Sequence, residues 1–417
     1  LHMDKMELEE GDPENHAFSF MSERKDRNKR NCWLTYTNEK THEIIRENIM
    51  RAPKYAGKIH GIGARYCPSI EDKVVRFADK DRHQLFVEPE GLDTTEMYVQ
   101  GMSTSMPIDV QYAFLRTIPG FEDVKMMRPA YAIEYDLLDP LQLYPTLEVI
   151  KLPGLYSAGQ SNGTSGYEEA AAQGLVAGIN AALKIQGKDP FILARHEAYI
   201  GSLVDDLVTK GADEPYRMMT SRSEYRLILR QDNADLRLTE KGHSIGLVGE
   251  ERYARFLDRK KKYEEAMDYI RTQRFTPKEE INRALESMGT APLTTGTGAD
   301  QILKRPEMTY RKMMEMLGCP AFDAEAVEEM EITVKYEGYI ARQEAAVRKA
   351  ARMENEKLPL DMDYLSLDGI STEAKQKMDK IRPLSLGQAA RIPGVSPADI
   401  SVLMVYVKQR KGKKGAE

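Results

Sequence analysis

The first part of the chain carries hydrophobic and polar residues in alternation, as a half-buried β-strand does. Leu34 and Tyr36 alternate with Thr35 and Thr37, which is the two-residue period of a strand with one buried face. Strand-like runs recur further along, at residues 84–88, 97–100, 130–136 and 147–152. We expect the first two of these to be antiparallel strands.

Helical patterns lie between these strand-like runs. Residues 41–50 are predicted to form a short helix, with Thr41 as its N-terminal cap. Residues 107–118 are predicted to form another, because Pro107 suits a first helical turn and Gly120 lies just past the end. The mixture of strands and helices indicates an α/β region.

Residues 154–187 have a different character from the region before them. A short strand-like run at 155–158 is followed by a turn at 159–166 that is rich in glycine. The next residues, 167–185, are predicted to form a helix with many Ala and Gly residues. Small residues allow either a flat ligand or a neighbouring backbone to come close, and close helix packing alone would explain them.

Beyond Asp189 the strand signals fade and helical periods continue to the end of the chain. Breaks occur at residues 211–215 and 291–298. Residues 383–409 are predicted to form two helices joined at 392–395, where Pro and Gly stand together. Such a hairpin would serve either as a site for nucleic acid or a partner, or as a compact helical cap.

Composition narrows the class of protein. The chain has 417 residues, of which 41% are hydrophobic and 30% charged, with a net charge of −6. This is a globular composition, and it excludes a bulk cationic nucleic-acid binder, although local basic patches still allow RNA binding. No run approaches the roughly 20 apolar residues that span a bilayer, and the polar N-terminus is unlike a signal peptide.

The three cysteines, Cys32, Cys67 and Cys319, are widely spaced. No pair has the spacing of metal ligands, and an odd, scattered set argues against a disulfide framework. We therefore expect a reducing, cytoplasmic location and no metal site. The chain begins Leu1-His2-Met3, so we expect the natural protein to extend further upstream.

Cys67 lies in a segment, residues 61–91, that is dense in charge. Arg65 and Lys73 would favour its thiolate, which is the reactive form of cysteine. Taken alone, a small buried loop residue is the simpler interpretation of a lone cysteine. The residues by themselves leave both interpretations open, a reactive thiolate and a small buried loop residue.

The glycine-rich turn at 159–166 resembles a nucleotide-binding corner. Its glycines let the backbone approach a ligand, and the first amides of the helix that follows suit an anionic group. The fingerprint GxGxxG and the P-loop are both absent from the sequence. The chain is therefore not predicted to contain a complete dinucleotide-binding fold.

Residues 214–239 form the densest basic stretch with interleaved aromatic residues. Arg222, Arg226 and Arg230 recur every four residues and would share one face of a helix. Arg217 and Arg237 belong to the same stretch. Phosphate contact and ion pairing with nearby carboxylates explain these arginines about equally well.

Together these motifs are very similar to one family, the tRNA uridine 5-carboxymethylaminomethyl modification enzymes MnmG, also called GidA. The segments that carry the resemblance include ARYCPSIEDKVVRFADKDRHQLFVEPEG, GTSGYEEAAAQGLVAGINAA, EPYRMMTSRSEYRLILRQDNADLRLT and VKYEGYIARQ. One departure is Ser161, where the family pattern has an aliphatic residue. The family is longer at its N-terminus, so the chain resembles a fragment that lacks the first FAD-binding segment.

The resemblance implies a function and a set of site residues. Members install an aminomethyl or carboxymethylaminomethyl group on carbon 5 of the wobble uridine, together with the GTPase MnmE. FAD, NADH and methylene-tetrahydrofolate as carbon donor take part, and a cytoplasmic homodimer is expected. Cys67 corresponds to a family cysteine, whose thiolate would add to carbon 6 of the uridine.

Binding residues follow from the same resemblance. For FAD they are Gly159, Gln160, Asn162, Gly163 and Thr164. For NADH they are Gly63, Ala64, Arg65, Tyr66, Ser69, Glu71, Asp72, Lys73, Arg76 and Phe77. For tRNA they are Arg217, Arg222, Arg226 and Arg230.

The fold implied is α/β plus all-α: a partial FAD-binding Rossmann-like fold with an inserted α/β domain and a helical C-terminal domain. The expected divisions are an inserted NADH or substrate region with returning strands, a second FAD-binding segment, a helical domain and a C-terminal helical subdomain, at residues 1–150, 151–188, 189–335 and 336–417. We expect this chain alone to bind FAD weakly or not at all.

Two alternatives remain at this point. The related folate- and FAD-dependent tRNA uridine methyltransferases are shorter and lack the helical C-terminal part. A non-catalytic nucleic-acid-binding scaffold would have no use for the cysteine motif or the glycine turn.

Overall fold

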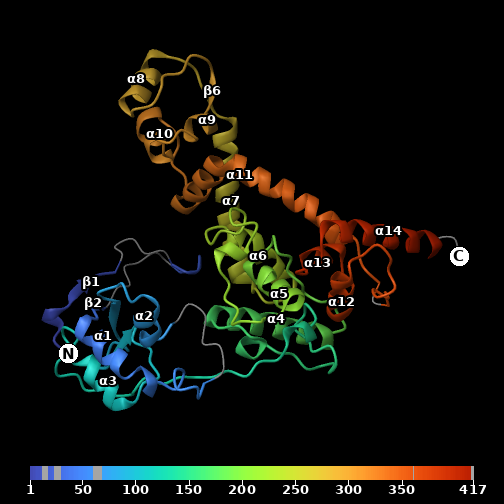
Figure 1. Ribbon diagram of the computed structural model, residues 1–417. Helices are drawn as coiled ribbons and strands as arrows, with labels where there is room; N and C mark the ends of the chain where they lie inside the picture. Colours follow the sequence, from blue (N-terminus) through green and yellow to red (C-terminus); the bar gives the residue numbers. More distant parts are fainter. Residues whose placement is uncertain (12–16, 23–29, 60–67, 360, 415–417) are drawn as a thin grey trace. The chain divides into compact units, whose positions relative to one another are not determined.

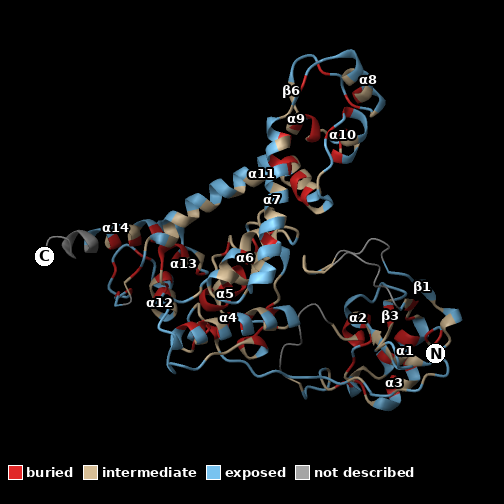
Figure 2. Ribbon diagram, turned by 180° about the vertical axis from the view of Figure 1, so that it is seen from behind, coloured by how far each residue is buried: buried red, intermediate tan, exposed pale blue. Residues whose placement is uncertain are grey.

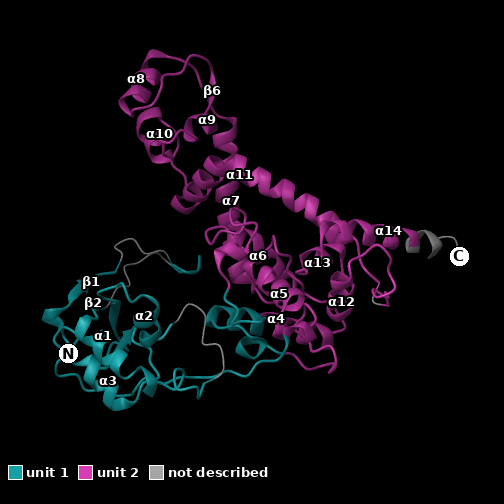
Figure 3. Ribbon diagram, in the orientation of Figure 1, with its two compact units in different colours: residues 1–139, 157–174, 212–217 teal, residues 140–156, 175–211, 218–417 magenta. Residues whose placement is uncertain are grey.

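The computed structural model describes residues 1–11, 17–22, 30–59, 68–359 and 361–414 (Figure 1). The chain divides into two compact units (Figure 3). The first unit contains residues 1–139, 157–174 and 212–217, and the second contains residues 140–156, 175–211 and 218–417. The mixed α/β and helical architecture agrees with the predicted fold class.

An antiparallel sheet of four strands forms the centre of the first unit. Its strands are adjacent in chain order: β1 Glu7–Glu9, β2 Cys32–Tyr36, β3 Gln84–Pro89 and β4 Met97–Gln100. In register, Leu34 lies opposite Phe86, and Val87 lies opposite Val99. The strands predicted from the alternation near Leu34 and at residues 84–88 and 97–100 are confirmed.

Three helices accompany this sheet: α1 Glu39–Glu47, α2 Ile70–Arg76 and α3 Ile108–Leu115. Helix α1 begins earlier than predicted because Asn38, rather than Thr41, caps it. The Asn38 side chain accepts from the Thr41 amide at 3.0 Å, and the Thr41 hydroxyl accepts from the Asn38 amide at 3.2 Å. Pro107 directly precedes α3, in agreement with the prediction.

The core of the first unit lies between the sheet and its helices (Figure 2). Ile45 of α1, Ile70 of α2 and Phe114 of α3 pack in one buried cluster with Leu85 and Val87 of β3. Helix α2 is not among the elements predicted from the sequence, and its Ile70 contributes to this core.

Two predicted strands do not form. Residues 130–136 have no regular secondary structure, and Tyr131, Ile133 and Tyr135 are exposed. A strand needs a partner, and none pairs with this segment among the described residues. Residues 147–152 form only isolated bridges, of which Leu143–Val149 is one.

The glycine-rich region leads into α4 Tyr167–Ile185, whose bounds agree with the prediction. Residues 167–174 of α4 belong to the first unit and residues 175–185 to the second, which is helical apart from one pair of short strands. Its helices are α5 Tyr199–Lys210, α6 Ala234–Ser244, α7 Glu250–Thr272, α8 Glu279–Ser287, α9 Ala299–Leu303, α10 Tyr310–Leu317, α11 Ala324–Asn355, α12 Thr372–Ile381, α13 Leu386–Arg391 and α14 Pro397–Lys414. Two short strands, β5 Arg274–Phe275 and β6 Thr297–Gly298, pair antiparallel. Short 3₁₀ turns occur at η1 Met3–Lys5, η2 Ile49–Arg51, η3 Pro140–Gln142, η4 Gly159–Asn162 and η5 Thr220–Arg222.

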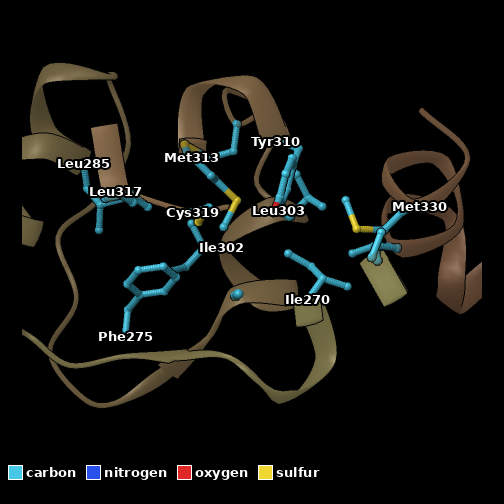
Figure 4. Close-up of a cluster of buried hydrophobic side chains, with 14 of the residues drawn as sticks. Ile270, Phe275, Leu285, Ile302, Leu303, Tyr310, Met313, Leu317, Cys319 and Met330 are labelled. Carbon is cyan, nitrogen blue, oxygen red and sulfur yellow. The ribbon is translucent and has the colours of Figure 1, made fainter. Parts of the chain in front are cut away.

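Two hydrophobic clusters organise the second unit, and the long helix α11 contributes to both. One surrounds Ile270, Ile302 and Met313, and it includes Met330 of α11 (Figure 4). The other is built from α12, α13 and α14, with Met353 of α11 packed against it. Helices α13 and α14 form the predicted C-terminal hairpin.

Candidate functional site

The glycine-rich turn has a backbone that suits close approach by a ligand. Residues Gly159–Asn162 form the 3₁₀ turn η4, and Gly163 follows it. Gly159 has φ +87° and Gly163 has φ +80°, a left-handed region that favours glycine. At Gly163 an added Cβ would lie 2.8 Å from the Ala212 methyl group. Both this short contact and the positive φ disfavour a side chain at this position.

The five residues predicted for FAD differ in what they present to solvent. Gly159, Asn162, Gly163 and Thr164 are buried, whereas Gln160 is exposed. The Gln160 side chain donates from Nε2 to the Asp136 carbonyl at 3.1 Å. Of these five residues, Gln160 is therefore the one whose side chain can reach a ligand.

A buried amide network lies behind the turn. Asn162 donates from Nδ2 to the Ser157 carbonyl at 2.9 Å and to Gln173 Oε1 at 2.8 Å. Its Oδ1 accepts from the Ser157 hydroxyl at 2.6 Å. The Thr164 hydroxyl donates to the Gly159 carbonyl at 3.0 Å. Asn162 and Thr164 therefore serve the shape of the turn rather than contact with a ligand.

Three residues of this network, Ser157, Ser161 and Gln173, were not among the predicted site residues. Gln173 lies in α4, and its signal in the sequence is a polar residue inside a run of Ala and Gly. Ser161 departs from the family pattern, and its hydroxyl lies 3.1 Å from that of Ser157 and donates to the Ala158 carbonyl at 3.3 Å. The serine thus finds partners inside the turn.

A second chain segment borders the turn. Tyr216 is buried and pairs with Thr164 in a parallel bridge, with its amide donating to the Gly163 carbonyl at 2.8 Å. This pairing brings Arg217 to the turn, where its Nη1 donates to the Ser165 carbonyl at 3.1 Å. Arg217 also lies 3.5 Å from the Glu169 carboxylate. Of the four arginines predicted for tRNA, Arg217 is the one that shares this unit.

The other arginines of the basic stretch do not share a helix face. Residues 223–233 are turns rather than a helix, so the four-residue spacing does not align Arg226 and Arg230. Arg230 is engaged by Asp232 at 3.0 Å and by Glu329. Burial lowers the pKa of its guanidinium, but these carboxylates outweigh that effect and the pKa is raised. Arg226 is exposed.

Arg237 supports the fold through its side chain, whereas the contact at Arg222 is made by its backbone carbonyl. The Arg222 carbonyl accepts from Arg195 Nη2 at 3.1 Å. Arg237 lies in α6 and donates to Asn233 Oδ1 at 2.8 Å and to the Arg230 carbonyl at 2.9 Å. Ion pairing and internal hydrogen bonding thus account for Arg230 and Arg237, as one of the two interpretations of the sequence expected.

The stretch predicted for NADH is described only in part, because Gly63, Ala64, Arg65, Tyr66 and Cys67 lie outside the described residues. In the described part, the Ser69 hydroxyl caps α2 by accepting from the Asp72 amide at 3.2 Å. The carboxylate of Glu71 is buried and accepts from the amide and the hydroxyl of Ser105 at 3.0 and 2.9 Å. These contacts fix the start of α2.

Asp72 and Lys73 are likewise engaged within the first unit. Asp72 accepts from Lys54 Nζ at 2.7 Å and from the Tyr55 hydroxyl at 3.0 Å. Burial raises the pKa of Asp72, but these hydrogen bonds outweigh it and the pKa is lowered. Lys73 donates to the Gly101 carbonyl at 3.1 Å. Arg76 and Phe77, by contrast, are exposed.

The described part of the chain contains neither a metal-binding cluster nor a helix that could span a membrane. No group of three or more His, Cys, Asp or Glu side chains there is arranged to hold a metal ion. Over the same residues, no helix combines the length and apolar character that a membrane span requires.

Comparison with known proteins gives one consistent result. Residues 1–189 match the family model for glucose inhibited division protein A. Residues 250–344 and 346–417 match the models for the C-terminal helical domain and C-terminal helical bundle of the tRNA modifying enzyme MnmG/GidA.

Individual relatives agree with the family models. The tRNA uridine 5-carboxymethylaminomethyl modification enzyme MnmG of Caldicellulosiruptor saccharolyticus is 55% identical over 416 residues, which cover 99% of this chain and 66% of that protein. The enzyme of the same name from Enterococcus faecalis is 56% identical over 409 residues, covering 97% and 65%.

Solved structures lead to the same family. The form II crystal structure of Aquifex aeolicus GidA has a TM-score of 0.85 and 45% identity, and the match covers 97% of this chain and 64% of that one. The chain thus spans 65–66% of the length of the two curated relatives.

Proposed function

Because the chain belongs to the MnmG/GidA family of tRNA modifying enzymes, we propose that it takes part in modifying the wobble uridine of tRNA. The product is 5-carboxymethylaminomethyluridine or its aminomethyl counterpart. The observation that carries the proposal is the match itself, at 55% identity over 416 residues with a relative of that name.

The glycine turn at residues 159–166 fits FAD as cofactor. The left-handed glycines Gly159 and Gly163 leave the backbone bare, and Gln160 is the exposed side chain of the turn. Gln160 would contact the flavin ring, and Asn162 and Thr164 would hold the turn from behind. When bound, FAD would supply two-electron redox chemistry, with NADH as the electron donor.

NADH would bind near α2 of the first unit. Glu71 and Asp72 are engaged by Ser105, Lys54 and Tyr55, so we assign them to the shape of the site. Arg76 and Phe77 are exposed and would meet the nucleotide, the first through charge and the second by stacking.

Cys67 would act as the nucleophile. Its thiolate adds to carbon 6 of the uridine, and the electron pair moves to carbon 5, which becomes nucleophilic. Carbon 5 then bonds to the one-carbon unit of methylene-tetrahydrofolate, and both bonds of that carbon to folate nitrogens break. Carbon 5 replaces one of these bonds, and an amine replaces the other: ammonia for the aminomethyl product, or an amino acid that carries the carboxymethyl group. Loss of the carbon 5 proton and departure of the thiolate restore the aromatic ring with its new substituent.

Arg226 and the C-terminal helices would bind the macromolecular partners. Arg226 is exposed and is the strongest candidate for a phosphate contact in the basic stretch. Arg217 would contact tRNA only by leaving Glu168 and Glu169. Helices α12 to α14 would receive tRNA and the GTPase MnmE, and the enzyme would act as a cytoplasmic homodimer.

A chimera tests the reaction. Residues 1–417 of this chain replace the matching part of the Enterococcus faecalis relative, and the gene is placed in cells that lack their own MnmG. Mass spectrometry of tRNA nucleosides should show the modified wobble uridine restored by the chimera and abolished by Cys67→Ser. The matched control is Cys32→Ser, which alters a half-buried residue of β2 and should leave the modification intact.

Two outcomes would overturn the proposal. Normal modified uridine in the Cys67→Ser chimera would exclude a covalent role for this thiol. Formation of 5-methyluridine instead of the carboxymethylaminomethyl product would identify the chain as a folate- and FAD-dependent methyltransferase.

A further inference from the structure

We propose that Gln173 is a positioning residue that holds the glycine turn in its ligand-facing form. The inference rests on the proposed function of this turn in FAD binding. Gln173 lies in the second turn of α4 and is completely buried. It touches no solvent and therefore acts only through the residues that it bonds.

Gln173 uses both ends of its amide. Its Oε1 accepts from Asn162 Nδ2 at 2.8 Å. Its Nε2 donates to Thr164 Oγ1 at 3.0 Å and to the carbonyl of Glu169 in its own helix at 3.0 Å. One side chain of α4 therefore bonds to two residues of the turn and is itself anchored to the helix.

The two residues that Gln173 bonds fix the rest of the turn. Thr164 donates to the Gly159 carbonyl, and Asn162 is bonded to the backbone and the side chain of Ser157. Gln160 lies between these anchored positions. The backbone that carries Gln160 is consequently held by a network in which Gln173 is the link to α4, while the Gln160 side chain donates to the Asp136 carbonyl.

Loss of this amide would leave buried polar groups without their partner. In Gln173→Leu the Asn162 amide loses one acceptor, and the Thr164 hydroxyl loses the donor that orients it toward Gly159. An unsatisfied buried group is costly, so the turn is expected to open rather than stay closed around an apolar side chain.

Helix α4 offers a matched control for the general effect of removing a buried amide. Asn180 is also buried, and its Nδ2 donates to the carbonyls of Val176 and Phe191 at 3.0 and 2.9 Å. Its Oδ1 accepts from the Phe191 amide at 2.7 Å. Asn180→Leu therefore removes a comparable set of bonds from the same helix without touching the glycine turn.

The experiment uses the full chain and follows amide hydrogen exchange of peptides that cover residues 157–166. We expect Gln173→Leu to speed exchange there by at least about tenfold, the factor that corresponds to one lost buried hydrogen-bond partner. Asn180→Leu should leave these peptides unchanged. Equal exchange of the turn in the Gln173→Leu and Asn180→Leu proteins would overturn the inference.

FAD is the probe for the second measurement. The protein for this measurement is the chimera with the Enterococcus faecalis relative, which supplies the part of that enzyme that this chain does not cover. In the chimera, Gln173→Leu should raise the dissociation constant for FAD by at least about tenfold, and Asn180→Leu should not. An unchanged FAD affinity in Gln173→Leu would overturn the inference. Absence of any FAD protection in the unmodified chimera would instead count against the proposed flavin site, and the exchange result on the chain itself would still decide the role of Gln173.

A second variant keeps the inference testable if Gln173→Leu fails to fold. Gln173→Glu keeps the size of the side chain and the acceptor for Asn162, but its ionised form has no donor for Thr164. Exchange of the turn, corrected for its intrinsic pH dependence, should be fast at pH 8 and slow again at lower pH, where the protonated carboxyl regains a donor. A pH-independent Gln173→Glu protein with a closed turn would contradict the inference.

Discussion

Asp399 stabilises the C-terminal hairpin, and the replacement Asp399→Asn measures how strongly. Asp399 is 5% exposed and lies in the first turn of α14. Its carboxylate accepts from the amides of Ser371 and Ser396 at 2.8 Å each and from the Ser396 hydroxyl at 2.6 Å. It therefore ties the start of α12 to the start of α14.

The pKa gives the size of the effect. These hydrogen bonds, led by that of the Ser371 amide, lower the pKa of Asp399 from 3.8 to about 2. A depression of this size corresponds to about 2 kcal/mol of stability at neutral pH. Asparagine turns one acceptor into a donor, so at least one of the two amides loses its partner whichever way the side chain lies. We expect Asp399→Asn to destabilise the hairpin by about 2 kcal/mol.

Amide hydrogen exchange of peptides from residues 371–403 is the assay, because a chain with several cores is not expected to unfold in one step. A loss of about 2 kcal/mol should speed their exchange by roughly 30-fold at pH 7. Asp368→Asn is the control, since Asp368 is exposed and near the same hairpin.

The pH dependence has a definite sign. The folded pKa is depressed, so the contribution of Asp399 is fully present above about pH 4 and is lost as the pH falls toward 2. The unmodified and Asp399→Asn proteins should therefore converge in acid. Equal exchange of the two at pH 7, or a difference that persists undiminished at pH 2, would refute the reasoning.

Three further predictions concern other parts of the chain. Gly163→Ala should destabilise the glycine turn by about 1–2 kcal/mol through its positive φ alone, measured as faster exchange of residues 157–166; unchanged exchange would count against the left-handed geometry. Burial raises the pKa of Glu329 to about 7. The stability that the protein has below about pH 4.5 should therefore decrease as the pH rises through 7. In thermal unfolding, Glu329→Gln should not show this decrease. Burial lowers the pKa of His42 and of His83, so the first unit should lose stability as the pH falls through about 6.5; fluorescence of Trp33, the single tryptophan, should report this loss, and a His42→Gln, His83→Gln double variant should not show it.

The sequence predicts much of the fold where local pattern and burial agree. The alternation around Leu34 marks the existence of β2 but does not give its faces correctly. Leu34 and Thr35, which lie on opposite faces, are both buried, whereas Tyr36 is only half-buried. The Ala- and Gly-rich run predicts the full extent of α4. Helix α1 starts before the predicted residue because Asn38 and Thr41 both suit a cap, and the reciprocal hydrogen bonds that decide between them are tertiary detail.

Pattern fails where the outcome depends on a partner. Residues 130–136 alternate as a strand does, yet they stay irregular, because a strand forms only when another strand pairs with it. The arginines at 222, 226 and 230 have helical spacing, but the segment turns and Arg230 is drawn to Asp232 and Glu329. Periodicity cannot predict an ion pair with Glu329, which lies almost a hundred residues further along the chain.

In the candidate site, too, local features are predictable from the sequence and features that depend on tertiary contacts are not. The glycine turn was predicted because glycines and a helix start are visible in sequence, and the structure gives Gly159 and Gly163 the expected backbone. Sequence does not separate Gln160, which is exposed, from Asn162, which is buried, because both are amides in one turn. The role of Gln173 is not visible in the sequence, because a buried amide is identified only by its hydrogen-bond partners.

Chemical trapping tests the central claim most directly. The chimera with the Enterococcus faecalis relative is incubated with its cofactors and with tRNA that carries 5-fluorouridine at the wobble position. Fluorine cannot leave as the proton does, so a thiolate that adds to carbon 6 should remain attached after carbon 5 has formed its new bond. Peptide mass spectrometry should then find the nucleotide on Cys67, and an adduct on Cys32 or Cys319, or none at all with an otherwise active chimera, would contradict the account.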